Sequence, residues 1–179
     1  MKSILISIKP KWCELIANGR KTIEVRKNKP KLEAPFKCYI YCTQCELLTR
    51  SHHNAMIYVS HNRKYQTALE RVGNITLSGK VIGEFVCDGI IEMCDIGTAF
   101  AAVTDYDVTG CCLSYDELHD YGKGKFLYGW HISSLVIYDK PKELSELMVT
   151  RPPLSWCYAE EKRSSYEGNT IQRTDAPMG

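Results

Sequence analysis

The sequence predicts an α+β fold that is mainly β: a small, bent β-barrel with flanking short helices. Three observations predict it. Several short segments alternate apolar and polar residues, glycine and proline residues separate them, and only two or three short stretches carry apolar residues at helical spacing. The 179 residues are 44% hydrophobic and 25% charged. This composition is typical of a globular domain and excludes a wholly disordered chain, a collagen and a coiled coil.

The first part of the chain predicts a strand, a short helix and two more strands. Residues 2–8 alternate isoleucines with other side chains, which indicates a buried strand. Residues 10–18 begin with proline, carry apolar residues at helical spacing and end at an Asn-Gly pair, which is typical of a helix and its stop. Residues 22–27 and 36–43 alternate again and predict the next two strands.

The second part predicts two long strands with a helical turn between them. Residues 80–91 and 126–138 are rich in β-branched and aromatic residues, which favours strands. In residues 114–118, Ser114 and Glu117 have the spacing of a capping box, which predicts the start of a helix.

The domain boundaries follow from composition. We expect one domain over residues 1–150, with the polar residues 44–79 as an insertion or a long loop. Residues 151–179 form a C-terminal extension. Its last ~19 residues (161–179) contain few large apolar groups, so we expect them to be disordered.

The charge is unevenly distributed along the chain, although the formal net charge is only +2. Residues 1–37 hold ten Lys and Arg against three Glu, a balance of +7, so residues 38–179 carry −5. This polarity favours a basic face that binds an anion, and nucleic acid is the commonest large anion. Two solvated faces of opposite sign are the alternative.

Hydropathy argues against a membrane location. No stretch approaches the roughly 18 uncharged apolar residues that a membrane-spanning helix needs. The apolar run over residues 3–8 is shorter than the core of a secretory signal peptide, which has about 7–15 residues. We therefore expect no membrane association and a cytoplasmic location.

The nine cysteines have two interpretations. In a reducing compartment they behave as small buried hydrophobes, and several lie inside predicted strands. A Cys-x2-Cys pair followed by histidines is alternatively a weak zinc candidate, although these histidines lack a regular ligand spacing. We expect no metal and no cofactor. The weak metal candidates are Cys42, Cys45, His52 and His53.

The densest group of chemically active residues is GRKTIEVR, residues 19–26. A helix ends at Gly19 and a strand follows, so Lys21 lies in the turn. Glu24 and Arg26 project from one face of the strand, about 7 Å apart. The two cations suit a phosphate, and the carboxylate accepts from an exocyclic amine or a ribose hydroxyl. The alternative is an exposed strand with a local ion pair worth about 0–1 kcal/mol.

Two aromatic residues are further candidates for ligand binding. Tyr128 and Trp130 share a face of the last predicted strand. Exposed aromatic rings beside a basic groove stack nucleic-acid bases, at about 1–3 kcal/mol per base. Packing in the core is the alternative for Trp130. Lys9, at the entrance of the first helix, extends the basic rim.

The same segment carries a family resemblance. GRKTIEVR fits G-x-K-x-x-E-x-R, and the chain resembles the ASCH domain family of the PUA-like superfamily, in particular its small bacterial and phage-borne members. The resemblance extends to residues 4–21, 79–90 and 128–146. It implies a PUA-like β-barrel with a cleft beside the motif, and RNA or nucleotide binding.

The resemblance also leaves enzymatic alternatives open. Some bacterial members are amidohydrolases of N4-acetylcytidine that use a Lys, a Thr and a Glu. Lys21 matches their Lys, but Glu24 stands where they have Thr, and Thr22 is in a different register. Glu84 is the candidate counterpart of their Glu. Another branch is reported as ribonuclease. If the protein is a hydrolase, we expect Lys21 and Glu24 to be catalytic; a regulatory protein-interaction module is a second alternative.

The sequence therefore predicts a domain that binds RNA or a nucleotide-like ligand in a polar cleft. The predicted ligand-binding residues are Lys9, Gly19, Lys21, Thr22, Glu24, Arg26, Tyr128 and Trp130.

Overall fold

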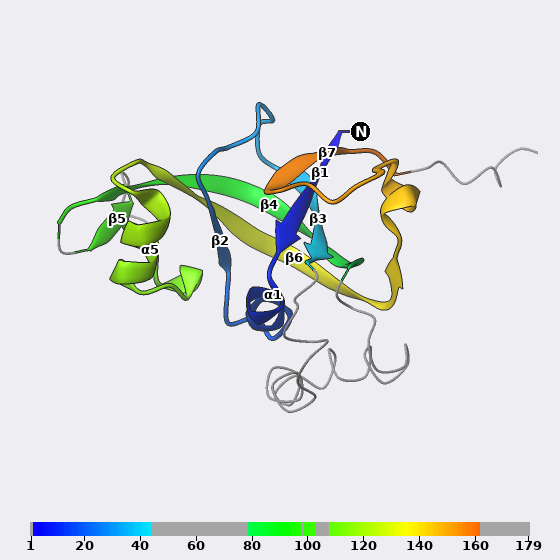
Figure 1. The fold of residues 1–179 in the computed structure, drawn as a ribbon, viewed down its shortest axis with the longest axis horizontal. Coiled ribbons are helices and arrows are strands. Elements are labelled where there is room, and N and C mark those ends of the chain that lie inside the picture. Colours follow the sequence, from blue (N-terminus) through cyan, green and yellow to red (C-terminus); the bar gives the residue numbers. More distant parts are fainter. Residues whose placement is uncertain (1, 44–78, 98, 103–107, 162–179) are drawn as a thin grey trace, which may run out of the picture.

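A computed structural model describes residues 2–43, 79–97, 99–102 and 108–161 (Figure 1). Within these ranges it contains strands, two α-helices and two short 3₁₀ turns. In chain order they are β1 (Ser3–Ile8), α1 (Pro10–Ala17), β2 (Ile23–Arg26), β3 (Phe36–Cys42), β4 (Lys80–Asp95), β5 (Phe100–Ala102), η1 (Thr109–Cys111), α5 (Tyr115–Gly122), β6 (Leu127–Lys142), η2 (Leu144–Leu147) and β7 (Trp156–Ala159).

The strands form one mixed sheet in the order β2-β6-β4-β3-β1-β7, and β5 pairs with β4. Only β1 and β3 are parallel; the other pairs are antiparallel. The two 16-residue strands β4 and β6 run through the length of the molecule (Figure 1). Register shifts interrupt their ladder, and such bulges bend and twist a sheet. The mainly β fold class is confirmed, whereas closure of the sheet into a barrel stays a prediction.

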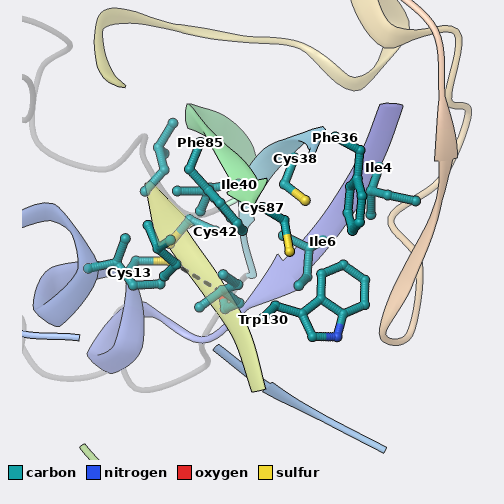
Figure 2. Packing of buried hydrophobic residues seen from close by; sticks show 14 residues of the cluster. Ile4, Ile6, Cys13, Phe36, Cys38, Ile40, Cys42, Phe85, Cys87 and Trp130 are labelled. Atoms are coloured by element: carbon teal, nitrogen blue, oxygen red, sulfur yellow. Dashed lines mark hydrogen bonds between the residues drawn. The ribbon is translucent and has the colours of Figure 1, made fainter. Parts of the chain in front are cut away.

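The main core lies on one face of this sheet, against α1 (Figure 2). Ile4, Ile6 and Ile8 point into it while Leu5 points to the opposite face, as the alternation of β1 predicted. Trp130 is fully buried here and packs edge-on against Phe36, with ring centroids 5.8 Å apart. Four buried cysteines belong to the same cluster: Cys13, Cys38, Cys42 and Cys87.

Two further clusters of buried hydrophobic residues lie outside the main core. Ile23 and Val25 of β2 pack with Met93, Leu118 and Leu127, which attaches α5 to the end of β4 and β6. On the outer face of β1 and β3, Leu5 and Tyr39 pack with residues of η2 and β7. β2 therefore places its apolar residues on one side, so Glu24 and Arg26 face the main core.

The predicted elements are present where the structure describes them, and most boundaries agree within a few residues. The helix predicted at Ser114 runs over α5, and Ser114 and Glu117 form the expected capping box. β4 and β6 are longer than predicted. β7 was not expected: it lies in the predicted C-terminal extension and pairs antiparallel with β1. The predicted insertion, apart from its last residue, and the predicted disordered end fall outside the described residues, except Glu161.

No α-helix in the described part of the chain is long and apolar enough to cross a membrane.

Candidate functional site

A tight turn after α1 places Lys21. The helix ends at Ala17, and Gly19 has φ +74°, a left-handed conformation that glycine adopts without strain. The backbone N–H groups of Arg20 and Lys21 both donate to the Leu15 carbonyl at 2.9 Å. The chain therefore folds back onto α1 immediately before β2 starts.

The ammonium group of Lys21 is enclosed, with only 2% of the residue exposed. Its Nζ donates to the carbonyl oxygen of Cys111 at 2.5 Å and lies 3.5 Å from Glu24 Oε2. It also lies 5.1 Å from the centre of the Trp12 ring. A carbonyl, a carboxylate and an aromatic face are all common partners of a lysine side chain, so three different groups hold Nζ in place.

Arg26 connects β2, at one edge of the sheet, with β1 and the segment before β7 at the other edge. Its Nη2 lies 2.9 Å from Glu24 Oε1 and donates to the Ser7 carbonyl at the end of β1, at 2.6 Å. Its Nη1 contacts Ser155 Oγ, just before β7, at 3.5 Å. One guanidinium group thus links β2 to β1 and to the segment before β7.

Lys21, Glu24 and Arg26 form a connected ionic triad that is more than nine-tenths buried at each residue. It contains two cations and one carboxylate. Burying charges costs several kcal/mol per ion unless the ions are paired and hydrogen-bonded. The sequence alternative of an exposed strand with a local ion pair is therefore wrong, because the triad faces the inside of the fold.

Three buried polar atoms at the triad have no hydrogen-bond partner among the described residues: Glu24 Oε2, Arg26 Nε and Trp130 Nε1. Glu24 and Trp130 are directly opposite each other on β2 and β6, as are Arg26 and Tyr128. The indole nitrogen of Trp130 points away from the cysteines of the core cluster (Figure 2). Native proteins satisfy nearly all buried polar groups, so this triad is incompletely hydrogen-bonded for a purely structural cluster.

Aromatic rings with lysines surround this region. The Tyr121 hydroxyl is within electrostatic reach of the triad: burial raises its pKa, the positive charge of Arg26 opposes that change, and Glu24 adds to it. Three lysine ammonium groups lie 4.2–5.2 Å from the centres of neighbouring rings. The pairs are Lys11 with Trp12, Lys27 with Tyr121 and Lys29 with Tyr128.

The structure brings some predicted site residues together and leaves others apart. Tyr128 and Trp130 share one face of β6, as their spacing predicted, and the pairing of β6 with β2 places them opposite Arg26 and Glu24. Trp130 is completely buried between Phe36 and Trp156, so it is also the core residue of the alternative interpretation.

The remaining predicted residues are not part of the triad. Lys9 is the exposed N-cap of α1, and Gly19 shapes the turn. Thr22 is exposed, and its backbone N–H donates to Gly110 O at 2.9 Å. Glu84 accepts from Lys37 and Tyr138, which places it on the outer face of the sheet, away from Lys21.

The weak metal candidates are only partly within the described residues. Cys42 is buried at the end of β3, and Cys45, His52 and His53 lie outside those ranges. In the part of the chain that the structure describes, no three His, Cys, Asp or Glu side chains gather as a metal site.

Sequence reasoning missed the partners that come from distant segments. These are the Cys111 carbonyl, Ser7, Ser155 and the rings of Trp12 and Tyr121. Backbone carbonyls leave no trace in a sequence pattern, and Trp12 was one of the apolar residues at helical spacing in residues 10–18. The unequal charge of the first 37 residues was the available signal for the lysines at the rings.

The fold and the site define a mixed-sheet domain with a buried polar triad beside its first helix. The ASCH domain model matches residues 6–163, and the chain therefore belongs to the ASCH domain family. It is similar in fold to the crystal structure of ASCH from Zymomonas mobilis, with 19% identity, a TM-score of 0.56 and coverage of 87% of this chain and 86% of that one.

Two mutant structures of the same Zymomonas mobilis protein are similar as well. One has 18% identity and a TM-score of 0.57, covering 88% of this chain and 90% of the other. The second has 19% identity and a TM-score of 0.56, covering 87% of both chains. At this level of identity the likeness concerns the fold alone. The search of curated proteins gave no match.

Proposed function

We propose that this ASCH domain binds RNA or a nucleotide through Lys21, Glu24 and Arg26. The observation that carries the proposal is the set of buried polar atoms without partners at the triad. A structural ion cluster is expected to satisfy all its atoms, since an unsatisfied buried polar group costs about 1–3 kcal/mol. Here one carboxylate oxygen and two N–H groups are left for a ligand.

The chemistry of these atoms matches a nucleotide. Glu24 Oε2 is an acceptor and suits an exocyclic amine or a ribose hydroxyl. Arg26 Nε and Trp130 Nε1 are donors and suit a carbonyl, a ring nitrogen or a phosphate oxygen. The triad's excess of one positive charge favours an anionic ligand.

The surrounding rings support the same assignment. Tyr121 and Tyr128 each carry a lysine near the triad, and Trp12 carries both Lys11 and Lys21. Aromatic faces combined with lysines are the usual means of holding single-stranded nucleic acid, because every base has a face to stack. Since the triad is almost completely buried, we expect a ligand to require a local opening before it contacts Glu24.

The hydrolase alternative finds less support in this geometry. Lys21 Nζ already donates to the Cys111 carbonyl and lies 3.5 Å from Glu24 Oε2, whereas a general base must reach the proton that it removes from the substrate. Glu84, the candidate counterpart of the amidohydrolase Glu, is engaged by Lys37 and Tyr138. Release of cytidine from N4-acetylcytidine by the purified protein would nevertheless establish that activity.

The test of binding is fluorescence anisotropy with a short labelled RNA at low and moderate salt. Lys21→Met preserves the side-chain length and removes the charge, and Lys140→Ala removes an exposed charge at the far end of β6 as a matched control. We expect Lys21→Met to weaken binding at least tenfold, Lys140→Ala to have little effect, and affinity to fall steeply with salt. Equal affinity of Lys21→Met and wild type, with both folded by circular dichroism, would show that the triad does not bind RNA.

A further inference from the structure

Residues 110–112, here called the strap, hold the turn that carries Lys21. Gly110 O accepts from the Thr22 N–H at 2.9 Å, and Cys111 O accepts from Lys21 Nζ at 2.5 Å. The thiol of Cys112 donates to Arg20 O at 3.2 Å. Three successive residues of the strap therefore contact three successive residues before β2, although about 90 positions separate the two segments.

The carbonyl that receives the Lys21 ammonium belongs to the peptide bond between two cysteines. Cys111 is 2% exposed and Cys112 is half-buried. Both are free thiols, and Cys112 has the left-handed φ of +54°. The peptide bond whose carbonyl contacts Lys21 would therefore be part of the ring that a bond between the two sulfurs closes.

We propose that Cys111 and Cys112 form a reversible disulfide that withdraws the Cys111 carbonyl from Lys21. The ring so formed contains both sulfurs, both Cβ and Cα atoms, and the carbon and nitrogen of the peptide bond. Its closure rotates this peptide and removes the thiol that donates to Arg20. Both contacts of the cysteines with the turn are lost in one event, and Lys21 is released. The effect on ligand binding rests on the proposed function.

The reaction needs a small disulfide oxidant, such as oxidised glutathione. The Cys112 thiolate attacks one sulfur of the oxidant, which forms a mixed disulfide and releases one thiol. The Cys111 thiolate then attacks the Cys112 sulfur, which closes the ring and releases the second thiol. Two protein thiols are oxidised, one small disulfide is reduced to two thiols, and the two protons pass from the cysteines to the leaving thiolates.

The geometry makes such a bond easy to reduce again. Neighbouring Cα atoms are about 3.8 Å apart across a trans peptide, whereas disulfide-linked residues usually have Cα atoms about 4.4–6.8 Å apart. A disulfide between adjacent residues is therefore strained, and strained disulfides have the high reduction potentials of regulatory bonds. Reduction restores the strap and its contact with Lys21.

Accessibility distinguishes this pair from the other cysteines near one another. Cys13 and Cys42 are each 1% exposed, and Cys38 and Cys87 are completely buried. An oxidant cannot reach either sulfur of those pairs without unfolding the core. Cys112 is reachable, and the second thiol is on the adjacent residue.

The experiment uses the full chain with and without oxidised glutathione. After alkylation and proteolysis, mass spectrometry should detect the peptide that contains Cys111 and Cys112 without alkyl groups. Its mass should be two hydrogen atoms below that of the same peptide with two thiols. Acetylation of Lys21 by a water-soluble reagent should rise several-fold in the oxidised protein. After dithiothreitol treatment it should fall back to the level of the untreated protein. Cys112→Gly, which suits the left-handed backbone, should abolish both effects. Cys94→Ser, at another half-buried cysteine, should preserve both.

The outcomes separate this proposal from the proposed function. The proposed disulfide switch is overturned if treatment with oxidised glutathione leaves Cys111 and Cys112 reduced. It is also overturned if the disulfide forms but Lys21 does not become more reactive. If Lys21 becomes reactive and RNA affinity falls, both proposals are supported. If Lys21 becomes reactive but a short RNA binds as before, the switch stands and the RNA assignment of Lys21 fails. Should Cys112→Gly not fold, Cys111→Ser gives the same comparison, because its hydroxyl can replace the thiol that contacts Leu113 O.

Discussion

Glu24 and Glu84 lie on opposite faces of the same sheet and have very different surroundings. On the outer face, one Glu84 oxygen accepts from Lys37 Nζ at 2.8 Å and the other from the Tyr138 hydroxyl at 2.5 Å. On the inner face, one Glu24 oxygen pairs with Arg26, whereas the other lies 3.5 Å from Lys21 Nζ and has no hydrogen bond within the described part of the chain.

The difference shows which polar cluster is complete. The outer cluster consists of Glu84, Lys37 and Tyr138 and is partly exposed. Both oxygens of its carboxylate have partners, so the cluster is complete as part of the sheet surface. The inner cluster is buried and incompletely hydrogen-bonded, which is the costly arrangement for a purely structural network. Incomplete satisfaction, and not the presence of charges, is what supports the proposal that the triad binds a ligand.

Glu24→Ala should produce the largest effect, because it leaves two buried cations without their carboxylate. Removing one partner of a buried ion cluster costs about 3–5 kcal/mol. We expect the free energy of unfolding in urea to fall by this amount. Glu84→Ala is the matched control and should cost ~1 kcal/mol or less, since its ion pair is partly exposed. Equal losses for the two variants would contradict the contrast between the clusters.

Gly110→Ala should disturb the inner cluster through the strap. A Cβ at this position would lie 2.1 Å from Thr22 Oγ1, which forces the strap and the turn apart. We expect a loss of about 1–3 kcal/mol in the free energy of unfolding, as for other overpacked positions. Adding Thr22→Ala removes the clashing oxygen and should recover most of the loss. A double variant no more stable than the single one would show that the clash is not the cause.

The sequence predicted the local arrangement of the triad but not its burial. A strand period of two residues puts Glu24 and Arg26 on one face, and the Asn-Gly stop puts Lys21 in the turn. Alternation of polar and apolar residues normally indicates that the polar face is exposed. Here the polar face of β2 is covered because α1 and the strap pack over it, and the strap is far away in sequence.

The edge strand β7 was also not predicted, because it too depends on a partner that is far away in sequence. β7 has four residues, follows a pair of prolines and carries no alternating pattern, so nothing local indicates a strand. It exists because β1 offers an unpaired edge to which it adds. Ser155, just before it, becomes a partner of Arg26 only through this pairing.

Trp130→Phe would sharpen the comparison by removing one of the unpartnered atoms. The indole N–H has no hydrogen-bond partner in the ranges that the structure describes, so its loss removes no hydrogen bond observed there. If a ligand accepts from it, RNA affinity should fall about tenfold, the value of one net hydrogen bond of ~1 kcal/mol or slightly more. Trp156→Phe, which alters the neighbouring ring, is the control and should bind nearly as wild type. Unchanged affinity of Trp130→Phe would exclude the indole nitrogen from the site.

The smallest effect should come from titrating the outer cluster with acid. Burial by itself raises the pKa of Glu84, but hydrogen bonds from Lys37 and Tyr138 and the nearby lysine charges outweigh it, so the net pKa is below the usual 4.5. A depressed folded-state pKa contributes stability that is fully present above the unfolded value and is lost as the pH falls through the folded value. The stability of wild type relative to Glu84→Gln should therefore be constant above about pH 5.5 and decline below about pH 4.5. Urea titrations of both proteins across this range measure the difference; a wild-type advantage that persists at the lowest pH would mean that the lysine and tyrosine contacts do not stabilise the Glu84 carboxylate.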